Sequence, residues 1–191
     1  GLTGRAEIFI LSDSRDPAFF AAETLAVATL RETCPLPVWY RRRTDNTGRK
    51  AGNIADFVTR WGGAYDHMLV LDADSLMTGA AMRKLARLME ENPRVGLIQT
   101  VSYAAGRDTL FARIQQFAAR LYTAPLVEGL LFWQQSDGNY WGHNAIVRIA
   151  PFVAHCDLPV LPGAEPFGGE ILCHDVVEAG LMRAAGWDVW V

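Results

Sequence analysis

The chain has 191 residues, of which half are hydrophobic and a fifth are charged. This composition is typical of a folded globular domain and excludes a disordered chain. The net charge of −3 gives no overall basic field for nucleic acid. No stretch approaches the roughly 18 uncharged apolar residues that a membrane-spanning helix needs, and no signal peptide opens the chain.

Cys34, Cys156 and Cys173 are too few and too scattered for a disulfide framework or a paired zinc motif, and they fit a reducing cytoplasm. Both ends look cut. A strand is expected within a few residues of Gly1, and the chain stops inside another, at Val191. We therefore expect an excised domain of a longer protein.

Apolar runs alternate with helical segments as far as residue 99. Asp16 and Pro17 form an N-cap and a first helical position, and the glycines at 62 and 63 end the second helix. The run at 68–71 lacks polar alternation, which predicts a strand buried on both faces. The expected strands are residues 7–11, 36–40, 68–71, 95–99, 144–149 and 187–191, and the expected helices are residues 17–32, 51–61, 79–92, 109–122 and 175–185.

Four strand–helix units within 99 residues predict an α/β fold with right-handed crossovers and a mainly parallel sheet covered by helices on both faces. Beyond residue 100 the regular alternation of strands and helices stops. The helix at 109–122 should be interrupted near Pro125. Its apolar spacing, for example Phe111, Ile114 and Leu121, predicts core packing, with a membrane-facing interfacial helix as the alternative.

Acidic side chains follow two of the expected strands. Asp13 follows the first strand, and Asp72 and Asp74 follow the third. Ligands of open parallel sheets bind at the carboxyl ends of the strands. Paired carboxylates there can supply the hard oxygen ligands that Mg²⁺ or Mn²⁺ shares with substrate phosphates. The alternative is that Asp72 caps a turn while Asp74 is solvated.

The loop at 41–50 carries five cations. It is read as a solvated loop, as an attractor of an anionic nucleotide sugar, or as a contact with anionic lipid headgroups.

Several segments, in this order, resemble the inverting family 2 glycosyltransferases, in particular the bacterial enzymes that build osmoregulated periplasmic glucans. The resemblance covers essentially all 191 residues. It implies a GT-A-type, Rossmann-like domain, with a nucleotide-binding half over 1–99 and a half that binds the glycosyl acceptor over 100–191, truncated at its C-terminus. The segments are Tyr40-Arg41-Arg42-Arg43, Lys50-Ala51-Gly52-Asn53-Ile54, residues 70–79 around Asp72-Ala73-Asp74, Tyr140-Trp141-Gly142-His143-Asn144 with Ala145 to Arg148, and His174-Asp175.

The resemblance implies roles for individual residues. Asp13 would contact the uracil or ribose, the Lys-x-Gly-Asn element would border the nucleotide, and the Asp-x-Asp pair would hold the UDP-sugar through Mg²⁺ or Mn²⁺. The implied donor and metal positions are Asp13, Lys50, Gly52, Asn53, Asp72 and Asp74, and the implied glycosyl-acceptor positions are Trp141, Gly142, His143, Asn144 and Arg148, with Trp133 and Gln134 as less central members.

Asp175 matches the aspartate that serves as general base in the family, although His174 replaces the acidic residue that usually precedes it. A carboxylate can accept the proton of the attacking hydroxyl. The alternative for Asp175 is a helix N-cap that forms a capping box with Glu178. A zinc site built from His143, His174 and Cys173 is disfavoured, because none of these residues has zinc-finger spacing.

The leading hypothesis is a metal-dependent hexosyltransferase that transfers glucose from UDP-glucose to a growing β-glucan. The parent enzyme would work at the cytoplasmic side of the bacterial inner membrane, held by parts absent from this soluble fragment. The family's Gln-x-x-Arg-Trp-type element has no counterpart after Asp175. We therefore expect weak or no turnover by the fragment. The alternatives are a nucleotidyltransferase and a non-catalytic sensor of nucleotide sugars.

Overall fold

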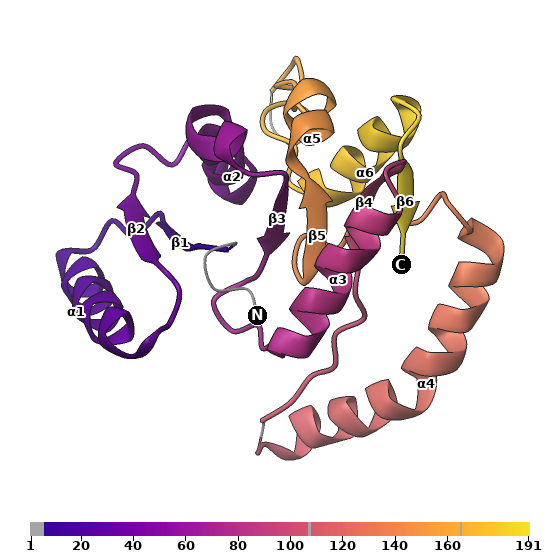
Figure 1. Ribbon diagram of the computed structural model, residues 1–191, viewed down its shortest axis with the longest axis horizontal. Coiled ribbons are helices and arrows are strands. Elements are labelled where there is room, and N and C mark those ends of the chain that lie inside the picture. Colours follow the sequence, from indigo (N-terminus) through magenta and orange to yellow (C-terminus); the bar gives the residue numbers. More distant parts are fainter. Residues whose placement is uncertain (1–5, 107, 165) are drawn as a thin grey trace. The chain divides into compact units, whose positions relative to one another are not determined.

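The computed structural model describes residues 6–106, 108–164 and 166–191. Its named strands form two separate sheets, one of two strands and one of four (Figure 1). The chain divides accordingly into two compact units, Gly1–Trp61 and Gly62–Val191, and each sheet lies within one unit. The α/β class expected from the sequence is confirmed.

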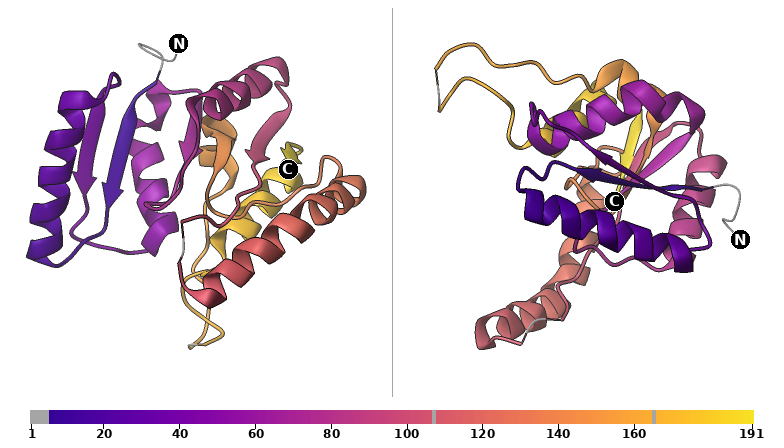
Figure 2. Two further views of the ribbon diagram at one scale, coloured as in Figure 1. Left: turned by 90° about the horizontal axis from the view of Figure 1, so that it is seen from below. Right: turned by 90° about the vertical axis from the view of Figure 1, so that its left-hand side faces the viewer.

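The first unit is a small parallel sheet between two helices. Strand β1 pairs in parallel with β2, and Figure 2 shows both strands between α1 and α2. Phe9 of β1 packs against Phe57 of α2 with the rings tilted, whereas Tyr40 of β2 stacks on Phe20 of α1. Phe9 pairs with Trp39, the neighbour of Tyr40 along β2, so Phe9 and Tyr40 point to opposite faces of the sheet. Helices α1 and α2 therefore cover opposite faces. The elements of this unit are β1 (Ile8–Ser12), α1 (Pro17–Thr33), β2 (Val38–Arg42) and α2 (Arg49–Trp61).

The start of α1 follows the expected capping pattern. The Asp16 carboxylate accepts a hydrogen bond from the Ala18 backbone N–H at 2.8 Å, and Pro17 occupies the first helical position. The side chain satisfies one of the N–H groups that a helix start leaves unpaired.

The second unit contains a mixed sheet with strand order β3-β5-β4-β6. Strand β5 is antiparallel to both β3 and β4, and only β4 and β6 run parallel. The expectation of a mainly parallel sheet is therefore wrong for this unit, because an apolar run marks a strand but does not encode its direction. The elements before α4 are η1 (Gly62–Ala64), β3 (His67–Val70), α3 (Gly79–Glu91) and β4 (Val95–Gln99), and those after it are β5 (Ala145–Arg148), α5 (Ile149–His155), α6 (His174–Ala184) and β6 (Asp188–Trp190).

Helices cover both faces of the four-stranded sheet, as expected. Met89 of α3 belongs to a buried cluster with Ile98 and Ile146, which are partners across β4 and β5. At Gly96 a Cβ atom would lie 2.6 Å from Met182 Cε of α6, so α6 packs directly on β4. Helix α5 contacts both β5 and α6.

Helix α4 (Leu110–Gln134) departs most from expectation. It runs through Pro125 and bends along its length, where the sequence predicted an interruption (Figure 1). A proline removes one backbone hydrogen bond and bends a long helix without necessarily ending it. No residue of α4 is buried, and Phe111 is 73% exposed, so the predicted core packing is wrong for the described structure. Among the described residues, no helix combines the length and apolarity needed to cross a bilayer.

Two further expectations fail. Strand β3 is half-buried along its length, because it forms the outer strand beside β5, and it is not enclosed on both faces. Helix α5 was not anticipated, because its seven residues include Pro151 and are too few to show a helical period.

Candidate functional site

The acidic turn (residues 72–75) directly follows β3. The Asp72 N–H donates to Ser75 Oγ at 3.2 Å, and the Ser75 N–H donates to the Asp72 carbonyl at 3.0 Å. These two bonds close a tight turn that is half-buried at Asp72 and exposed at Asp74. Both carboxylates therefore stand at the carboxyl end of a strand, as the sequence predicted.

The Gly142 loop (residues 140–144) leads into β5, which pairs with β3 so that Ala145 lies opposite Val70. The loop therefore starts its strand at the end of the sheet where the acidic turn begins. Gly142 has φ +83°, and Asn144 has φ +52°. The side-chain atoms Asn144 Oδ1 and His143 Nδ1 are buried without a hydrogen-bond partner among the described residues. Such unpaired groups are uncommon in the interior of a protein, and a bound water or ligand is one way to satisfy them.

Asp175 lies in the first turn of α6 and faces the Gly142 loop. A Cβ atom at position 142 would lie 3.2 Å from Asp175 Oδ2, which is tighter than an ordinary van der Waals contact, and the φ of +83° independently favours glycine here. The N-terminal turn of a helix favours a negative charge. No hydrogen bond or ion pair engages the Asp175 carboxylate among the described residues, so it is available to a ligand.

The N-cap alternative for Asp175 is overturned. Cys173 is the N-cap residue of α6, and it makes no side-chain capping bond. The Glu178 side chain turns instead toward His174, whose Nδ1 lies 3.2 Å from Glu178 Oε2 without the geometry of a hydrogen bond. Both side chains are buried, so they lie on the side of the first turns of α6 that faces the protein interior.

Tyr140 links these parts electrostatically. Its side chain is 1% exposed, and burial raises the pKa of its hydroxyl far above the ordinary value. The charges of Glu178, Asp175 and Asp72 raise that pKa further, in this order. The phenol is therefore protonated at neutral pH. The carboxylates of Asp72 and Asp175 both lie within electrostatic reach of this one buried hydroxyl.

Gln99, the last residue of β4, was missed by the sequence analysis. Its amide nitrogen donates to the carbonyls of Thr100 and His143 at 2.8 and 2.9 Å, and its amide oxygen accepts from the Trp141 N–H at 2.8 Å. The only signal in the sequence was a polar residue at the end of the apolar run 95–98.

Three predicted glycosyl-acceptor residues lie apart from this group. The Arg148 guanidinium donates to the carbonyls of Met89 and Val95, at 2.8 and 3.1 Å, at the opposite end of β5 from the Gly142 loop. Its side chain therefore ties β5 to the end of α3. Trp133 and Gln134 belong to the last turn of α4, where Trp133 is 82% exposed.

In the first unit, Asp13 forms an ion pair that the sequence analysis did not anticipate. Arg43 Nε and Nη2 donate to the two Asp13 carboxylate oxygens at 2.8 and 2.7 Å, and these bonds raise the pKa of Arg43. The same guanidinium donates to the carbonyls of Thr47 and Arg49. The Asp13 side chain thus anchors the loop that leads into α2, and the basic run is not simply a solvated loop.

The Lys-x-Gly-Asn element forms the first turns of α2, with Lys50 half-buried. A Cβ atom on Gly52 would lie 2.1 Å from the Thr47 carbonyl oxygen, so this position requires glycine. Asn53 is buried, and its Oδ1 accepts from Arg41 Nη1 at 2.7 Å. Both residues therefore have a structural role in shaping the loop before α2 and the start of that helix.

The acidic turn could hold a divalent cation only together with other ligands, such as water or substrate phosphates. The described residues include no group of three or more His, Cys, Asp or Glu side chains placed to hold a metal by themselves. Asp72 and Asp74 supply hard oxygen ligands, and Mg²⁺ commonly binds one or two carboxylates and completes its shell with water and substrate phosphates. The donor set thus fits a cation that arrives with a phosphate-bearing substrate.

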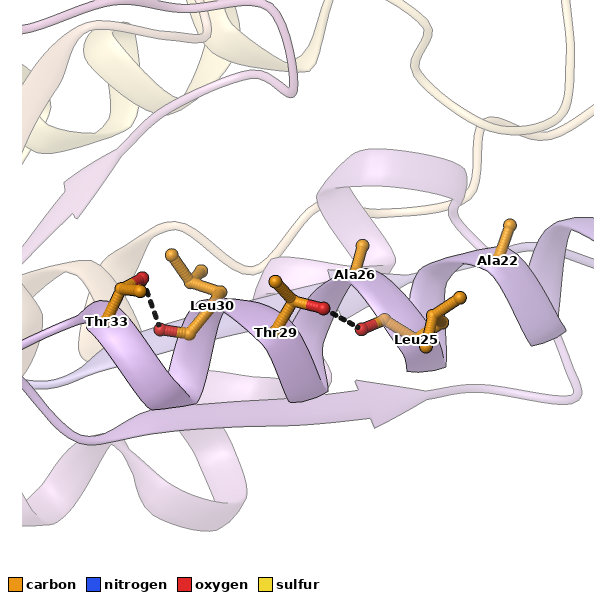
Figure 3. Close-up of a pocket in the computed structure, with 6 residues that line it drawn as sticks. All are labelled: Ala22, Leu25, Ala26, Thr29, Leu30 and Thr33. Carbon is orange, nitrogen blue, oxygen red and sulfur yellow. Dashed lines mark hydrogen bonds between the residues drawn. The ribbon is translucent and has the colours of Figure 1, made fainter.

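An open hollow on the outer side of α1 is not a candidate active site. Figure 3 shows its lining, which contains no acid, base or nucleophile beyond two threonines. The hydroxyls of Thr29 and Thr33 donate to the helix carbonyls of Leu25 and Leu30, so the surface they leave is apolar.

Residues 67–154 match the family described as Glycosyl transferase family group 2. This stretch includes the acidic turn, Gln99 and the Gly142 loop.

The chain is also 53% identical, over 98% of its length, to Glucans biosynthesis glucosyltransferase H of Pseudomonas aeruginosa (strain PAO1). It is 53% identical over 96% of its length to the enzyme of that name from Caulobacter vibrioides (strain NA1000), and 52% identical over 97% to that from Dickeya dadantii. It spans only 22%, 28% and 22%, respectively, of the lengths of these relatives. Asp175 and the first unit lie outside the family match and are covered by these similarities.

Proposed function

We propose that this chain is the GT-A-type catalytic portion of an inverting glucosyltransferase that transfers glucose from UDP-glucose to a growing β-glucan. The observation that carries the proposal is the Asp175 carboxylate, which is unpaired among the described residues and lies beside Gly142. The charges of Asp175 and Asp72 both raise the pKa of the buried Tyr140 hydroxyl. The similarity to enzymes named for glucan synthesis supports the choice of substrates.

In the proposed reaction the donor's diphosphate binds at the acidic turn and the glycosyl acceptor binds against the Gly142 loop. Mg²⁺ or Mn²⁺, held by Asp72 and Asp74, would neutralise charge on the departing diphosphate. The acceptor hydroxyl oxygen attacks the anomeric carbon while the bond from that carbon to the UDP oxygen breaks. Asp175 accepts the hydroxyl proton, and the single displacement inverts the anomeric centre.

The loop supplies groups suited to a sugar. The indole of Trp141 offers a flat face for a pyranose ring. Asn144 Oδ1 and His143 Nδ1 are unpartnered and can bond to sugar hydroxyls. Asp13, Lys50, Gly52 and Asn53 are proposed to border the nucleotide, with Asp13 acting jointly with Arg43. We propose no acceptor contact for Arg148.

The parent enzyme is proposed to work at the cytoplasmic face of the inner membrane. The resemblance to bacterial enzymes that build periplasmic glucans supports this placement, and the relatives are about three and a half to four and a half times as long as the chain, as their covered shares imply.

The test is Asp175→Asn in the full-length enzyme, assayed with UDP-glucose. Loss of the base should lower kcat by about 10²- to 10⁴-fold and leave the dissociation constant of UDP-glucose nearly unchanged. Asp137→Asn is the matched control, because Asp137 is exposed and lies outside the proposed site. Unchanged activity of Asp175→Asn, with binding intact, would favour a sensor. Release of glucose 1-phosphate instead of UDP would favour a nucleotidyltransferase, because transfer of the uridylyl group from UDP-glucose leaves that product.

A further inference from the structure

The side-chain amide of Gln99 holds the backbone on both sides of Gly142. It accepts from the N–H of Trp141 and donates to the carbonyl of His143, the residues immediately before and after the glycine. It also donates to the Thr100 carbonyl, so one 1% exposed side chain makes three hydrogen bonds. Because the amide sits at the end of β4, the loop is held to the central part of the sheet.

Thr100 extends this attachment by one residue. Its N–H and its hydroxyl both donate to the Asn144 carbonyl, at 3.0 and 2.6 Å. The backbone of the Gly142 loop is thus held at Trp141, His143 and Asn144 by two consecutive residues. Asn144 has φ +52° and the intervening Gly142 has φ +83°, both in the left-handed region. Glycine adopts this conformation freely, whereas at Asn144 it persists only where the surroundings hold it.

Only an amide of this length fits the three bonds. The Trp141 N–H needs an acceptor, whereas the two carbonyls need a donor, and a side-chain amide presents both at one end. Asn carries the same amide on a side chain one methylene shorter. A carboxylate here would keep the acceptor but would direct negative charge at two carbonyl oxygens. A leucine would remove the partner of three part-buried backbone groups.

We propose that Gln99 is a positioning residue for the glycosyl acceptor: it sets the gap between Gly142 and Asp175 in which the attacking hydroxyl must lie. This inference rests on the proposed function. The gap is narrow, because a single added Cβ atom at position 142 would come within 3.2 Å of Asp175 Oδ2. A small displacement of the loop therefore changes the position of the acceptor relative to the base, while the acidic turn is held by its own bonds.

The experiment compares Gln99→Leu and Gln99→Glu with Asn92→Ala in the full-length enzyme. Asn92 makes one side-chain bond, to the Leu88 carbonyl at 2.9 Å, near the other end of β4, so it controls for a general loss of stability. The measurements are kcat, KM for a β-glucan oligosaccharide, the UDP-glucose dissociation constant and the melting temperature.

Both Gln99 variants should raise the oligosaccharide KM or lower kcat by ~10- to 100-fold, the effect expected of an ångström-scale misplacement, with UDP-glucose binding within about twofold. Asn92→Ala should change neither kinetic constant, even where it lowers the melting temperature. If the Gln99 variants match Asn92→Ala in these constants, the inference is overturned. If they fail to fold, Thr100→Val, which removes only the hydroxyl bond, should still give a smaller change in the same direction, and no change overturns the inference.

A failure of the proposed function is distinguishable. If the unmodified enzyme transfers no glucose, hydrogen exchange of the 140–144 segment still tests whether Gln99 holds the Gly142 loop in place. Exchange should rise in Gln99→Leu and stay unchanged in Asn92→Ala, and equal exchange in the two variants would overturn the inference.

Discussion

Gly142 illustrates how much the site depends on single residues. Its φ of +83° is strained for any other residue, and its missing side chain leaves space for the Asp175 carboxylate. The glycine was predicted from the sequence because of the motif around it, but its contact with a residue far along the chain was not predictable from that motif.

We expect Gly142→Ala to be damaging in two ways. The left-handed conformation should cost about 1–2 kcal/mol of stability, and the added methyl group should lower the transfer rate by displacing Asp175 or the acceptor. Urea unfolding and initial rates measure the two effects separately. Gly129→Ala is the control, because a Cβ atom there meets nothing within 4 Å and a helical glycine gains stability on replacement. Equal behaviour of the two variants would contradict the assignment of Gly142.

Asp74→Ala tests the proposed cation site. Asp74 is exposed on the acidic turn, so its removal should leave the fold intact. UDP-glucose affinity in Mg²⁺ should fall at least about tenfold, the loss that even an outer-shell partner typically causes, whereas affinity in EDTA should match that of the unmodified protein. Calorimetric titration measures both. Glu91→Ala, an exposed carboxylate at the end of α3, is the control. A silent Asp74→Ala would refute the metal proposal.

At the scale of helices and strands, arginine side chains form hydrogen bonds between elements that are distant in the sequence. Arg43 joins the end of β1 to the loop before α2, and Arg148 joins β5 to the end of α3. Both arginines belong to segments that suggested ligand binding, yet their guanidinium groups bond to the protein itself. A sequence motif identifies a charged residue but not which nearby carbonyl or carboxylate it will meet.

Arg148→Lys should therefore reduce stability without affecting acceptor binding. A lysine ammonium cannot reproduce the bonds of a planar guanidinium to several carbonyls, and the loss should be about 1–3 kcal/mol. Chemical denaturation measures it, with the exposed Arg87→Lys as the control. A large rise in the KM for the β-glucan oligosaccharide, with stability unchanged, would instead restore Arg148 to the acceptor site.

At the scale of the whole molecule, the chain carries both a candidate catalytic group and an unusually exposed helix. Helix α4 has no buried residue, and its aromatic side chains are open to solvent within the described structure. The chain also spans about a fifth to a quarter of the length of its curated relatives.

We expect the 191-residue chain by itself to bind UDP-glucose weakly in the presence of Mg²⁺ and to synthesise little or no glucan. Most of the sequence of the longer relatives lies outside it. Incorporation of radiolabelled glucose into polymer, compared with that of the full-length enzyme, measures the difference. Rapid polymer synthesis by the isolated chain would refute this expectation.

The sequence by itself determined the features that depend on near neighbours along the chain. The capping of α1 by Asp16, the span of β4 and the position of Asp72 and Asp74 at a strand end all follow from local patterns of polarity, and the structure confirms them. The resemblance to a family likewise rested on short contiguous motifs. These features are predictable because side-chain periodicity and capping act over only a few residues.

Only the tertiary structure decided which distant residues meet. It inserted β5 antiparallel between β3 and β4, placed Gly142 beside Asp175, and gave Gln99 its three bonds to the backbone. It also paired Asp13 with Arg43 and left α4 without a covering layer. These outcomes depend on pairing and packing between segments far apart in sequence. Because a buried polar group must find a partner wherever the fold provides one, the choice of partner is settled in three dimensions.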